Sequence, residues 1–238
     1  MKYLIYIICV LFLFSCKKDA IELPKSNKTI LGDIENHSDI NFFFNLNKKD
    51  TILSFNNHNT IKPINLVCTI DKRLSLRLVM PEVINLLEKK KNHTGKKTES
   101  IYVYSYADSI TNKLSFYPFS SIRYKFDAEF SKFYIIEHSN LYMNFQNFSI
   151  NFNKKNQITV DGNYIDRAEL IDFLKDFIPF VSQEKTALLH LNFEKSLSFE
   201  QYIQNKIFLH EILSDKVVFS PVEFIYDAKK LPDCGCKL

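Results

Sequence analysis

Residues 157–178, QITVDGNYIDRAELIDFLKDFI, decide the fold class because they have the pattern of a β-hairpin followed by a helix. Short strand-like runs flank Asp161-Gly162, and an Asp-Gly pair in that setting is a strong signal for a tight hairpin turn. Asp166 and Glu169 have the spacing of a capping box at the start of the helix, and Pro179 follows its predicted end. Apolar residues spaced three and four apart predict one buried helix face. These residues are Leu170, Ile171, Leu174, Phe177 and Ile178.

The chain continues after this helix with a strand, a second helix and a last strand. Ala187–Phe193 and Val222–Tyr226 are apolar runs typical of buried strands. Between them a helix is predicted to begin at Ser198, with Gln201 three residues later as its capping partner. Residues 151–230 are therefore predicted to form a C-terminal ββαβαβ unit.

Residues 31–150 predict a β-rich α+β region. A change in the phase of the apolar face near Asn147 predicts a bulge or a turn. A helix is predicted from about Pro81, because proline suits the first turn of a helix. We predict an α+β fold with mixed sheets and helices on one face. Strand-like runs occur at 41–46, 51–55, 64–70, 101–106, 122–126, 133–137, 141–145 and 148–152.

The two halves of the chain share a short similarity. Ile70-Asp71-Lys72-Arg73-Leu74-Ser75-Leu76 matches Phe193-Glu194-Lys195-Ser196-Leu197-Ser198-Phe199 at an offset of 123 residues. At the same offset Ile101 falls on Phe224, in the next predicted strand of each half. Pro81, however, has Gln204 as its counterpart. A degenerate duplication and a chance similarity over seven residues both remain open.

The element order of residues 157–227 resembles the periplasmic domain of the ExbD/TolR biopolymer-transport family. Ile158–Gly162 matches the family's Ile-x-Val-(Asn/Asp)-Gly turn, and Glu169-Leu170 matches the opening of its first helix. Asn192-Phe193-Glu194 departs from the Ala-Asp that usually ends the family's strand, and residues 3–15 lack the proton-coupled Asp of its membrane helix. The resemblance implies binding of partner proteins or peptidoglycan, and homodimers, but no motor function.

The first twenty residues have the pattern of a secretion signal. Lys2 is followed by an apolar run of about a dozen residues, which is too short to span a membrane. Ser15-Cys16 resembles the lipobox of bacterial lipoproteins, in which the signal is removed and the cysteine becomes the lipidated first residue. Lys17 stands where an Asp retains well-studied lipoproteins in the inner membrane, so the resemblance favours the outer membrane. Residues 1–15 are thus the predicted signal peptide, and residues 16–30 a lipidated polar tether.

Composition and charge exclude several classes of function. The net charge of +4 over 238 residues is too small a bias to favour nucleic acid as a partner. The four glycines are scattered, so no phosphate-cradling loop is predicted, and we expect no cofactor. Cys68 lies in a strand-like run and is expected to be a small buried side chain. Cys234 and Cys236 form a Cys-x-Cys tail at 231–238, for which a bridge, pairing with Cys68, metal binding and no special role all remain open.

The histidines and carboxylates suggest no catalytic centre. None of the six histidines forms an i, i+4 pair or a His-Glu-x-x-His motif, so no metal site is predicted. His190 and His210 are expected to be structural. Asp161 is explained by its turn and Asp166 with Glu169 by the cap, while Asp172 is expected on the exposed helix face. The sequence therefore favours a protein that is not an enzyme, with no catalytic residues.

These features predict a lipid-anchored envelope protein, attached to the membrane through Cys16 and exposed to the periplasm or the cell surface. Its expected role is non-catalytic binding or scaffolding, linked to biopolymer transport or peptidoglycan by the resemblance. One alternative is a surface adhesin or glycan-binding lipoprotein, which requires an exposed row of aromatic rings in residues 100–160. A second is a hydrolase, which requires His190 or His210 to converge with carboxylates in a cleft.

Overall fold

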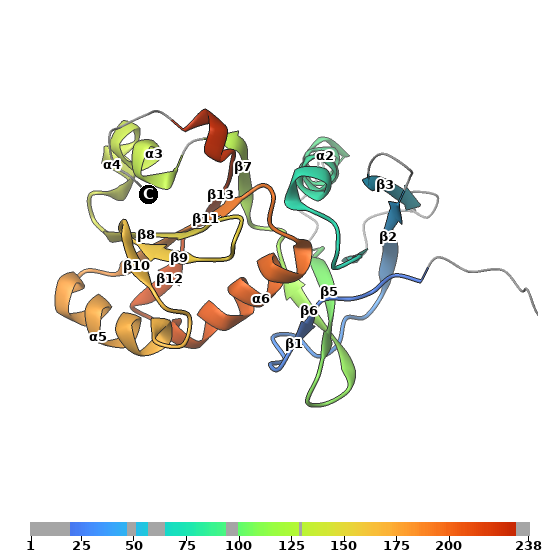
Figure 1. Cartoon of the computed structure of the whole chain (residues 1–238), viewed down its shortest axis with the longest axis horizontal. Coiled ribbons are helices and arrows are strands. Elements are labelled where there is room, and N and C mark those ends of the chain that lie inside the picture. The colour runs from blue at the N-terminus through green and yellow to red at the C-terminus, as the bar shows by residue number, and fades with distance from the viewer. Residues whose placement is uncertain (1–19, 47–50, 57–64, 94–99, 129, 232–238) are drawn as a thin grey trace, which may run out of the picture.

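The described part of the protein forms two β-sheets that lie side by side, the first with one helix and the second with several (Figure 1). The computed structural model describes residues 20–46, 51–56, 65–128 except 94–99, and 130–231. The first sheet is formed by β1 (Lys25–Ser26), β2 (His37–Leu46), β3 (Thr51–Asn56), β4 (Asn65–Ile70), β5 (Tyr102–Asp108) and β6 (Lys113–Pro118), with helix α2 (Leu76–His93). The second sheet is formed by β7 (Arg123–Ala128), β8 (Gln146–Phe152), β9 (Ile158–Val160), β10 (Asn163–Ile165), β11 (Ala187–Glu194), β12 (Val217–Phe219) and β13 (Val222–Tyr226). Its helices are α3 (Ser131–Glu137), α4 (Ser139–Tyr142), α5 (Leu170–Ser182) and α6 (Phe199–Leu209).

The predicted α+β class and the ββαβαβ order of the C-terminal unit are confirmed. β9 and β10 form the hairpin around Asp161-Gly162, and α5, β11, α6 and β13 follow in the predicted order. The strand order of the second sheet is β10-β9-β8-β11-β13-β7, with β12 beside β11. All eight residues of β11 are buried, because this strand lies at the centre of the sheet and is covered on both faces.

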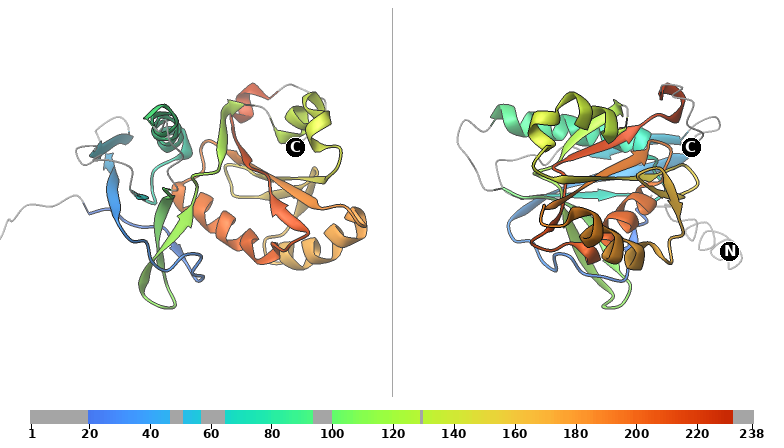
Figure 2. Two further views of the ribbon diagram at one scale, coloured as in Figure 1. Left: turned by 180° about the vertical axis from the view of Figure 1, so that it is seen from behind. Right: turned by 90° about the vertical axis from the view of Figure 1, so that its left-hand side faces the viewer.

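The prediction that helices cover only one face is wrong for the second sheet. α5 and α6 cover one face, and α3 and α4 lie on the opposite face (Figure 2). Side chains alternate between these faces along each strand. Phe148 of β8 therefore packs against Phe177 of α5, whereas His190 of β11 packs against Tyr142 of α4.

The strands predicted at 133–137 and 141–145 are also wrong, because this segment forms α3 and α4. Its β-branched and aromatic residues favour strands, but Phe130, Tyr134, His138 and Tyr142 recur every four residues and share one helical face. Tyr134 stacks on His138, with ring centroids 4.0 Å apart, and meets Tyr142 at 6.2 Å. The phase change near Asn147 is consequently the passage from helix through a turn at 143–145 to strand, so of the two predicted alternatives the turn is found and the bulge is not.

Two helix starts differ from the predictions. α2 begins at Leu76 and contains Pro81, so that proline lies inside the helix and not in its first turn. α5 begins at Leu170 with Glu169 as its N-cap residue, without the side-chain hydrogen bond of a capping box. Asp166 instead accepts a hydrogen bond from the Tyr164 hydroxyl at 2.8 Å. Pro179 lies in the last turn of α5, whereas the predicted Ser198–Gln201 capping box of α6 is confirmed.

The two sheets repeat the same arrangement of strands. The order β3-β2-β4-β5 in the first sheet corresponds to β9-β8-β11-β13 in the second, with an antiparallel outer pair and parallel inner pairs in both. Ile40 pairs with Cys68 in one sheet, as Ile150 pairs with Leu191 in the other. The topology therefore favours the duplication that the sequence left open.

The two turns that follow β4 and β11 bind each other reciprocally. An antiparallel bridge joins Ser75 to Ser198, and each of the backbone hydrogen bonds around it has a counterpart 123 residues away. The Leu76 amide donates to the Leu197 carbonyl at 2.9 Å, and the Phe199 amide donates to the Leu74 carbonyl at 2.7 Å. The similar segments seen in the sequence are thus the segments that join the two sheets.

The division between the sheets differs from the boundary expected at residue 150. β7 and β8 belong to the second sheet, so the chain passes from one sheet to the other between Pro118 and Arg123. In the first sheet, Cys68 of β4 pairs with Tyr104 of β5. In the second sheet, Asn192 of β11 pairs with Phe224 of β13, so the preceding residues, Leu191 and Glu223, also lie side by side. The strands after the helices therefore correspond at an offset of 119 residues, because α6 is shorter than α2.

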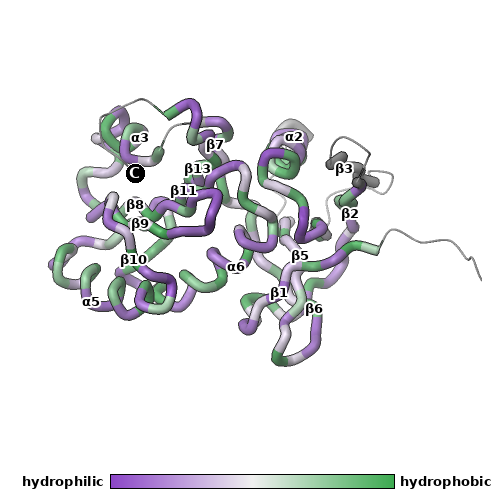
Figure 3. Tube along the Cα trace, in the orientation of Figure 1, coloured by the Kyte–Doolittle hydropathy of each residue, from purple (hydrophilic) through white to green (hydrophobic). Residues whose placement is uncertain are grey.

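Hydrophobic and hydrophilic residues alternate along the helices, so each helix can bury one face (Figure 3).

Candidate functional site

The predicted lipidation site, Cys16, lies outside the described residues, but the chain that follows it enters the fold at Glu22. The Glu22 amide donates to the Asp71 carboxylate at 3.1 Å, and its carbonyl accepts from the Lys72 amide at 2.7 Å. Its carboxylate pairs with Lys72 at 3.3 Å and with Arg73 at 2.9 Å. The β4–α2 turn therefore holds Glu22 through both its backbone and its side chain.

Residues 22–34, called the strap here, continue along the first sheet. β1 pairs with the end of β5 in parallel, where β4 has already turned away into α2. The Ala107 amide donates to the Pro24 carbonyl at 2.8 Å. Farther along, the buried Tyr106 hydroxyl donates to the Lys28 carbonyl at 2.8 Å and accepts from the Ile30 amide at 2.9 Å.

The strap also contributes apolar side chains to the interior. Ile34 is buried with Val67, Val103 and Phe116 on one face of the first sheet, and Leu31 packs against them. The expectation of a flexible tether over residues 16–30 is consequently wrong for Glu22 and the residues after it. Polar composition suggested a free linker, but the hydrogen bonds that hold the strap use mainly its backbone, which composition does not reveal.

A buried polar network joins the two sheets through α6. Lys206 is fully buried and forms an ion pair with Glu223 of β13, which is 2% exposed. The Tyr202 hydroxyl donates to the other Glu223 oxygen at 2.8 Å and lies 3.2 Å from Lys206 Nζ. From Tyr202 the contacts continue to Tyr124 at 3.2 Å, and from Tyr124 to Tyr104 of the first sheet at 3.0 Å.

Burial governs the protonation of this network. It lowers the pKa of Lys206, and the neighbouring Glu223 carboxylate offsets part of that effect. Burial also raises the pKa of Tyr202 well above the usual value, and the Glu223 charge raises it further. Lys206 lies 4.6 Å from the ring centroid of Tyr117, which adds a cation–π contact to the ion pair. The network is arranged to hold the sheets together, with its charged groups shielded from solvent.

His190 belongs to a second polar cluster, beneath α3 and α4. Its side chain is fully buried, and its Nε2 lies 2.9 Å from the Asn147 Oδ1 atom, whereas Nδ1 has no hydrogen-bond partner among the described residues. Burial lowers the pKa of His190 to about 4, so the ring is neutral near pH 7. Asn192 donates to Ser131 at 3.0 Å and to Ser149 at 3.1 Å. The partners here are amides and hydroxyls, and not the carboxylates that the hydrolase alternative requires.

The remaining sequence candidates are dispersed. Asp161 lies in the hairpin turn with φ of 48° and accepts a hydrogen bond from the Ser149 amide at 2.8 Å. Asp172 is exposed on α5, as its helical position predicts. His210 is half-buried in the 3-10 turn after α6, and burial lowers its pKa. The structure brings neither histidine together with these carboxylates.

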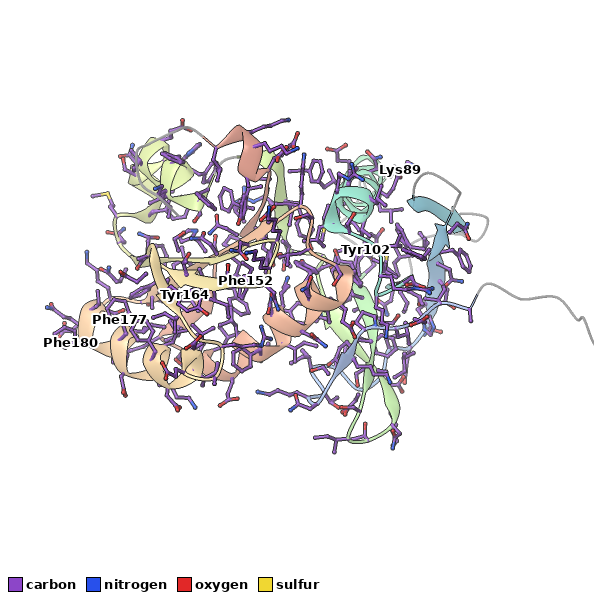
Figure 4. All side chains as sticks on the ribbon, in the orientation of Figure 1. Lys89, Tyr102, Phe152, Tyr164, Phe177 and Phe180 are labelled. Carbon is purple, nitrogen blue, oxygen red and sulfur yellow. The ribbon has the colours of Figure 1, made fainter. Side chains whose placement is uncertain are left out.

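The aromatic residues of the 100–160 region lie mainly in the core. Tyr104, Tyr106, Phe148 and Phe152 are fully buried. Large exposed hydrophobic side chains instead include Ile136, Leu141 and Met143 on and beside α3 and α4, and Phe180 at the end of α5 (Figure 4). Cys68 is buried, as expected, and has no disulfide partner among the described residues, whereas Cys234 and Cys236 lie outside them.

Lys206 and Glu223 were not identified as interacting residues from the sequence. Lys and Glu side chains ordinarily lie at the protein surface, and no local sequence pattern predicts that these two pair with each other. The relevant signal was indirect: Glu223 occupies a strand whose neighbours are all apolar or aromatic.

In the part of the chain that the structure describes, no group of three or more His, Cys, Asp and Glu side chains could hold a metal ion. Across the same residues, every helix is too short or too polar to cross a membrane. Comparison of the chain with protein-family models, with curated proteins and with solved structures finds no match.

Proposed function

We propose that this chain is a lipid-anchored envelope protein with a non-catalytic binding or scaffold role. The observation that carries the proposal is the sequence of the first sixteen residues: a short apolar run behind Lys2 that ends at Ser15-Cys16. Lipidated Cys16 would attach the protein to the outer membrane, facing the periplasm or the cell surface. Acyl chains contribute about 0.8 kcal/mol per buried CH2 group, so two or more chains give stable attachment.

A binding role is supported by the positions of the buried polar side chains, which contact one another in the interior. Lys206 and Glu223 pair with each other in the interior, and His190 contacts an amide. These buried groups stabilise the fold, which supports the proposal that the protein acts through its surface and through the place where it is anchored.

The C-terminal unit resembles the ExbD/TolR domain, which supports envelope proteins or peptidoglycan as partners. The same resemblance supports homodimerisation. The observed ββαβαβ order is compatible with that likeness. β8, however, lies between β9 and β11, and β7 extends the opposite edge, so the sheet contains strands that the resemblance did not include. The proposal therefore rests first on the anchor and second on the resemblance.

The anchor is tested by replacing Cys16 with Ala in the full-length protein and separating membranes from the soluble fraction. We expect the wild type in the membrane fraction with incorporated radiolabelled palmitate, and the C16A variant without label and released from membranes. A variant that still pellets with membranes would contradict the lipoprotein assignment.

The partner is tested by cross-linking cells that contain the tagged protein and by incubating the protein with purified peptidoglycan sacculi. Retention on sacculi, or capture of envelope-spanning transport proteins, is the expected result. Capture of neither, combined with surface labelling of intact cells, would favour an exterior binding protein.

A further inference from the structure

We infer that the end of the first sheet next to Glu22 lies against the lipid surface. This inference rests on the lipidation of Cys16 proposed above and specifies how the protein is then oriented. The anchor-side surface, as it is called here, consists of Glu22, Lys72, Arg73 and Phe44. Glu22 precedes β1, Lys72 and Arg73 belong to the β4–α2 turn, and Phe44 lies near the carboxyl end of β2, which runs parallel to β4 in the first sheet (Figure 1).

The length of chain between the anchor and the fold limits how far the two can separate. Only six residue steps separate Cys16 from Glu22, and a fully extended chain spans at most about 3.6 Å per residue. The anchor-side surface therefore stays within about 20 Å of the lipidated residue. A flexible linker that ended at residue 30 would allow many more orientations.

Glu22 is also firmly held. Its amide, carbonyl and carboxylate all bind the β4–α2 turn, and the strap behind it is tied to β5 and to Tyr106. Pulling on the anchor would have to break these contacts before the reach increased. The short reach is thus a property of the folded protein.

The anchor-side surface also has side chains that suit contact with lipid headgroups. Arg73 lies over the Phe44 ring, 4.5 Å from its centroid, and the side chain of Arg73 is 39% exposed. A long basic side chain suits the headgroup region, because it combines an apolar stem with a charged end, and here the apolar ring of Phe44 lies beneath it. Glu22 and Asp71 balance the charges of Lys72 and Arg73, so contact should not depend on anionic lipid.

The test uses the absence of tryptophan from the chain. Single variants Phe44→Trp and Phe180→Trp are made in the full-length lipidated protein and placed in vesicles that carry a dansyl-labelled headgroup lipid. Phe180 is 83% exposed and lies at the far end of the second unit (Figure 4). We expect energy transfer from the tryptophan of the Phe44→Trp variant to exceed that of the Phe180→Trp variant several-fold, equally in zwitterionic and in phosphatidylglycerol vesicles.

A matched control inserts about 20 Gly and Ser residues after Lys18, which keeps the anchor but lengthens its r.m.s. reach by about 25 Å. Energy transfer in the Phe44→Trp variant should then fall to about the level of the Phe180→Trp variant, with membrane binding unchanged. Equal transfer from both positions without the insertion would overturn the inference while leaving the lipid anchor intact. Absence of acylation would overturn both proposals.

A second readout needs no substitution at Phe44, which packs against the core. Lys72 and Lys175 each form one exposed or half-exposed ion pair, the first at the anchor-side surface and the second on α5. Amine labelling of the vesicle-bound wild type should slow several-fold at Lys72, relative to protein in detergent, and stay unchanged at Lys175. Unchanged labelling at Lys72 would contradict contact with the membrane.

Discussion

At the scale of single residues, Lys206 shows how a cation is accommodated in the interior of this protein. Its ammonium group has lost its water and is compensated by Glu223, by the Tyr202 hydroxyl and by the ring of Tyr117. Burying two charges costs about as much as their attraction returns, so such a pair adds little net stability while removal of one partner costs a great deal.

Lys206→Met should therefore destabilise the protein by about 3–5 kcal/mol, because Glu223 is left buried without its cation. The double variant Lys206→Met with Glu223→Gln should recover part of this loss, since glutamine is neutral and can still accept from Tyr202. Urea unfolding of the two single variants and the double variant measures the coupling. Strictly additive losses would show that the pair does not interact as described.

His190 makes stability depend on pH. Its pKa is about 4 in the folded protein because burial disfavours the imidazolium, whereas an unfolded histidine has a pKa of about 6.5. Between these values the unfolded chain binds a proton that the folded protein does not, so stability falls as the pH decreases from about 6.5 to about 4. The contribution of this one residue amounts to about 3 kcal/mol.

The measurement is the free energy of unfolding at a series of pH values for the wild type and for His190→Gln. Glutamine can keep a hydrogen bond to Asn147 and does not titrate, so the variant should show a flatter profile in this window. Parallel profiles would mean that His190 does not remain neutral. The sequence predicts a structural histidine in a strand, but not the packing of its ring against Tyr142, because residues 141–145 have the pattern of a strand and Tyr142 lies in α4.

At the scale of elements, one side chain of β5, Tyr106, binds the strap at two points. Tyr106→Phe removes a donor to the Lys28 carbonyl and an acceptor for the Ile30 amide. We expect a loss of about 1–2 kcal/mol in stability and faster tryptic cleavage at Lys25 and Lys28. Tyr164→Phe is a suitable control, because Tyr164 is exposed and its hydroxyl donates to Asp166 two residues away. An unchanged rate of cleavage in the Tyr106→Phe variant would mean that other contacts hold the strap in place.

Pro81 is a local conflict within α2. It has no amide to donate to the Arg77 carbonyl four residues earlier, so the helix lacks one hydrogen bond there. Pro81→Ala should restore that bond and stabilise the protein by about 1–2 kcal/mol, which thermal unfolding would detect. Destabilisation would instead show that packing of the ring outweighs the missing bond.

The elements that the sequence predicted correctly are those with a strong local signal: the Asp161-Gly162 hairpin, the Ser198–Gln201 cap and the apolar run of β11. The start of α2 was missed because proline is a stronger local signal than Ser75. Ser75, however, aligns with Ser198 in the repeat, and that correspondence indicates the observed start. α3 and α4 were missed because their shared face, spaced every four residues, is made of aromatic residues that also favour strands.

At the scale of the whole molecule, the two sheets depend on each other. The Tyr104 ring of the first sheet stacks on Phe119 at 3.9 Å and meets Phe199 and Tyr202 of α6 edge-on at 5.3 and 6.2 Å. The reciprocal hydrogen bonds of the two turns add backbone pairing across the same junction. A duplicated unit of this kind buries its apolar surface only when its counterpart is present. Sequence similarity over seven residues could indicate the repeat, but the pairing of the two copies is a tertiary property.

A fragment of residues 122–238 should consequently fail to fold by itself, although it contains the complete second sheet. Without the first sheet, Tyr202 and Phe199 lose the Tyr104 ring, and Leu76 no longer donates to the Leu197 carbonyl. A small domain has only a few kcal/mol of stability, so exposing this junction should abolish cooperative unfolding. We expect the fragment to show poor proton NMR dispersion and no sigmoidal urea transition, in contrast to the full chain. A well-dispersed fragment with a sharp transition would establish that the sheets are independent domains, and that the contacts of Tyr104 with Tyr124 and of Tyr117 with Lys206 orient the sheets without being needed to fold the second one.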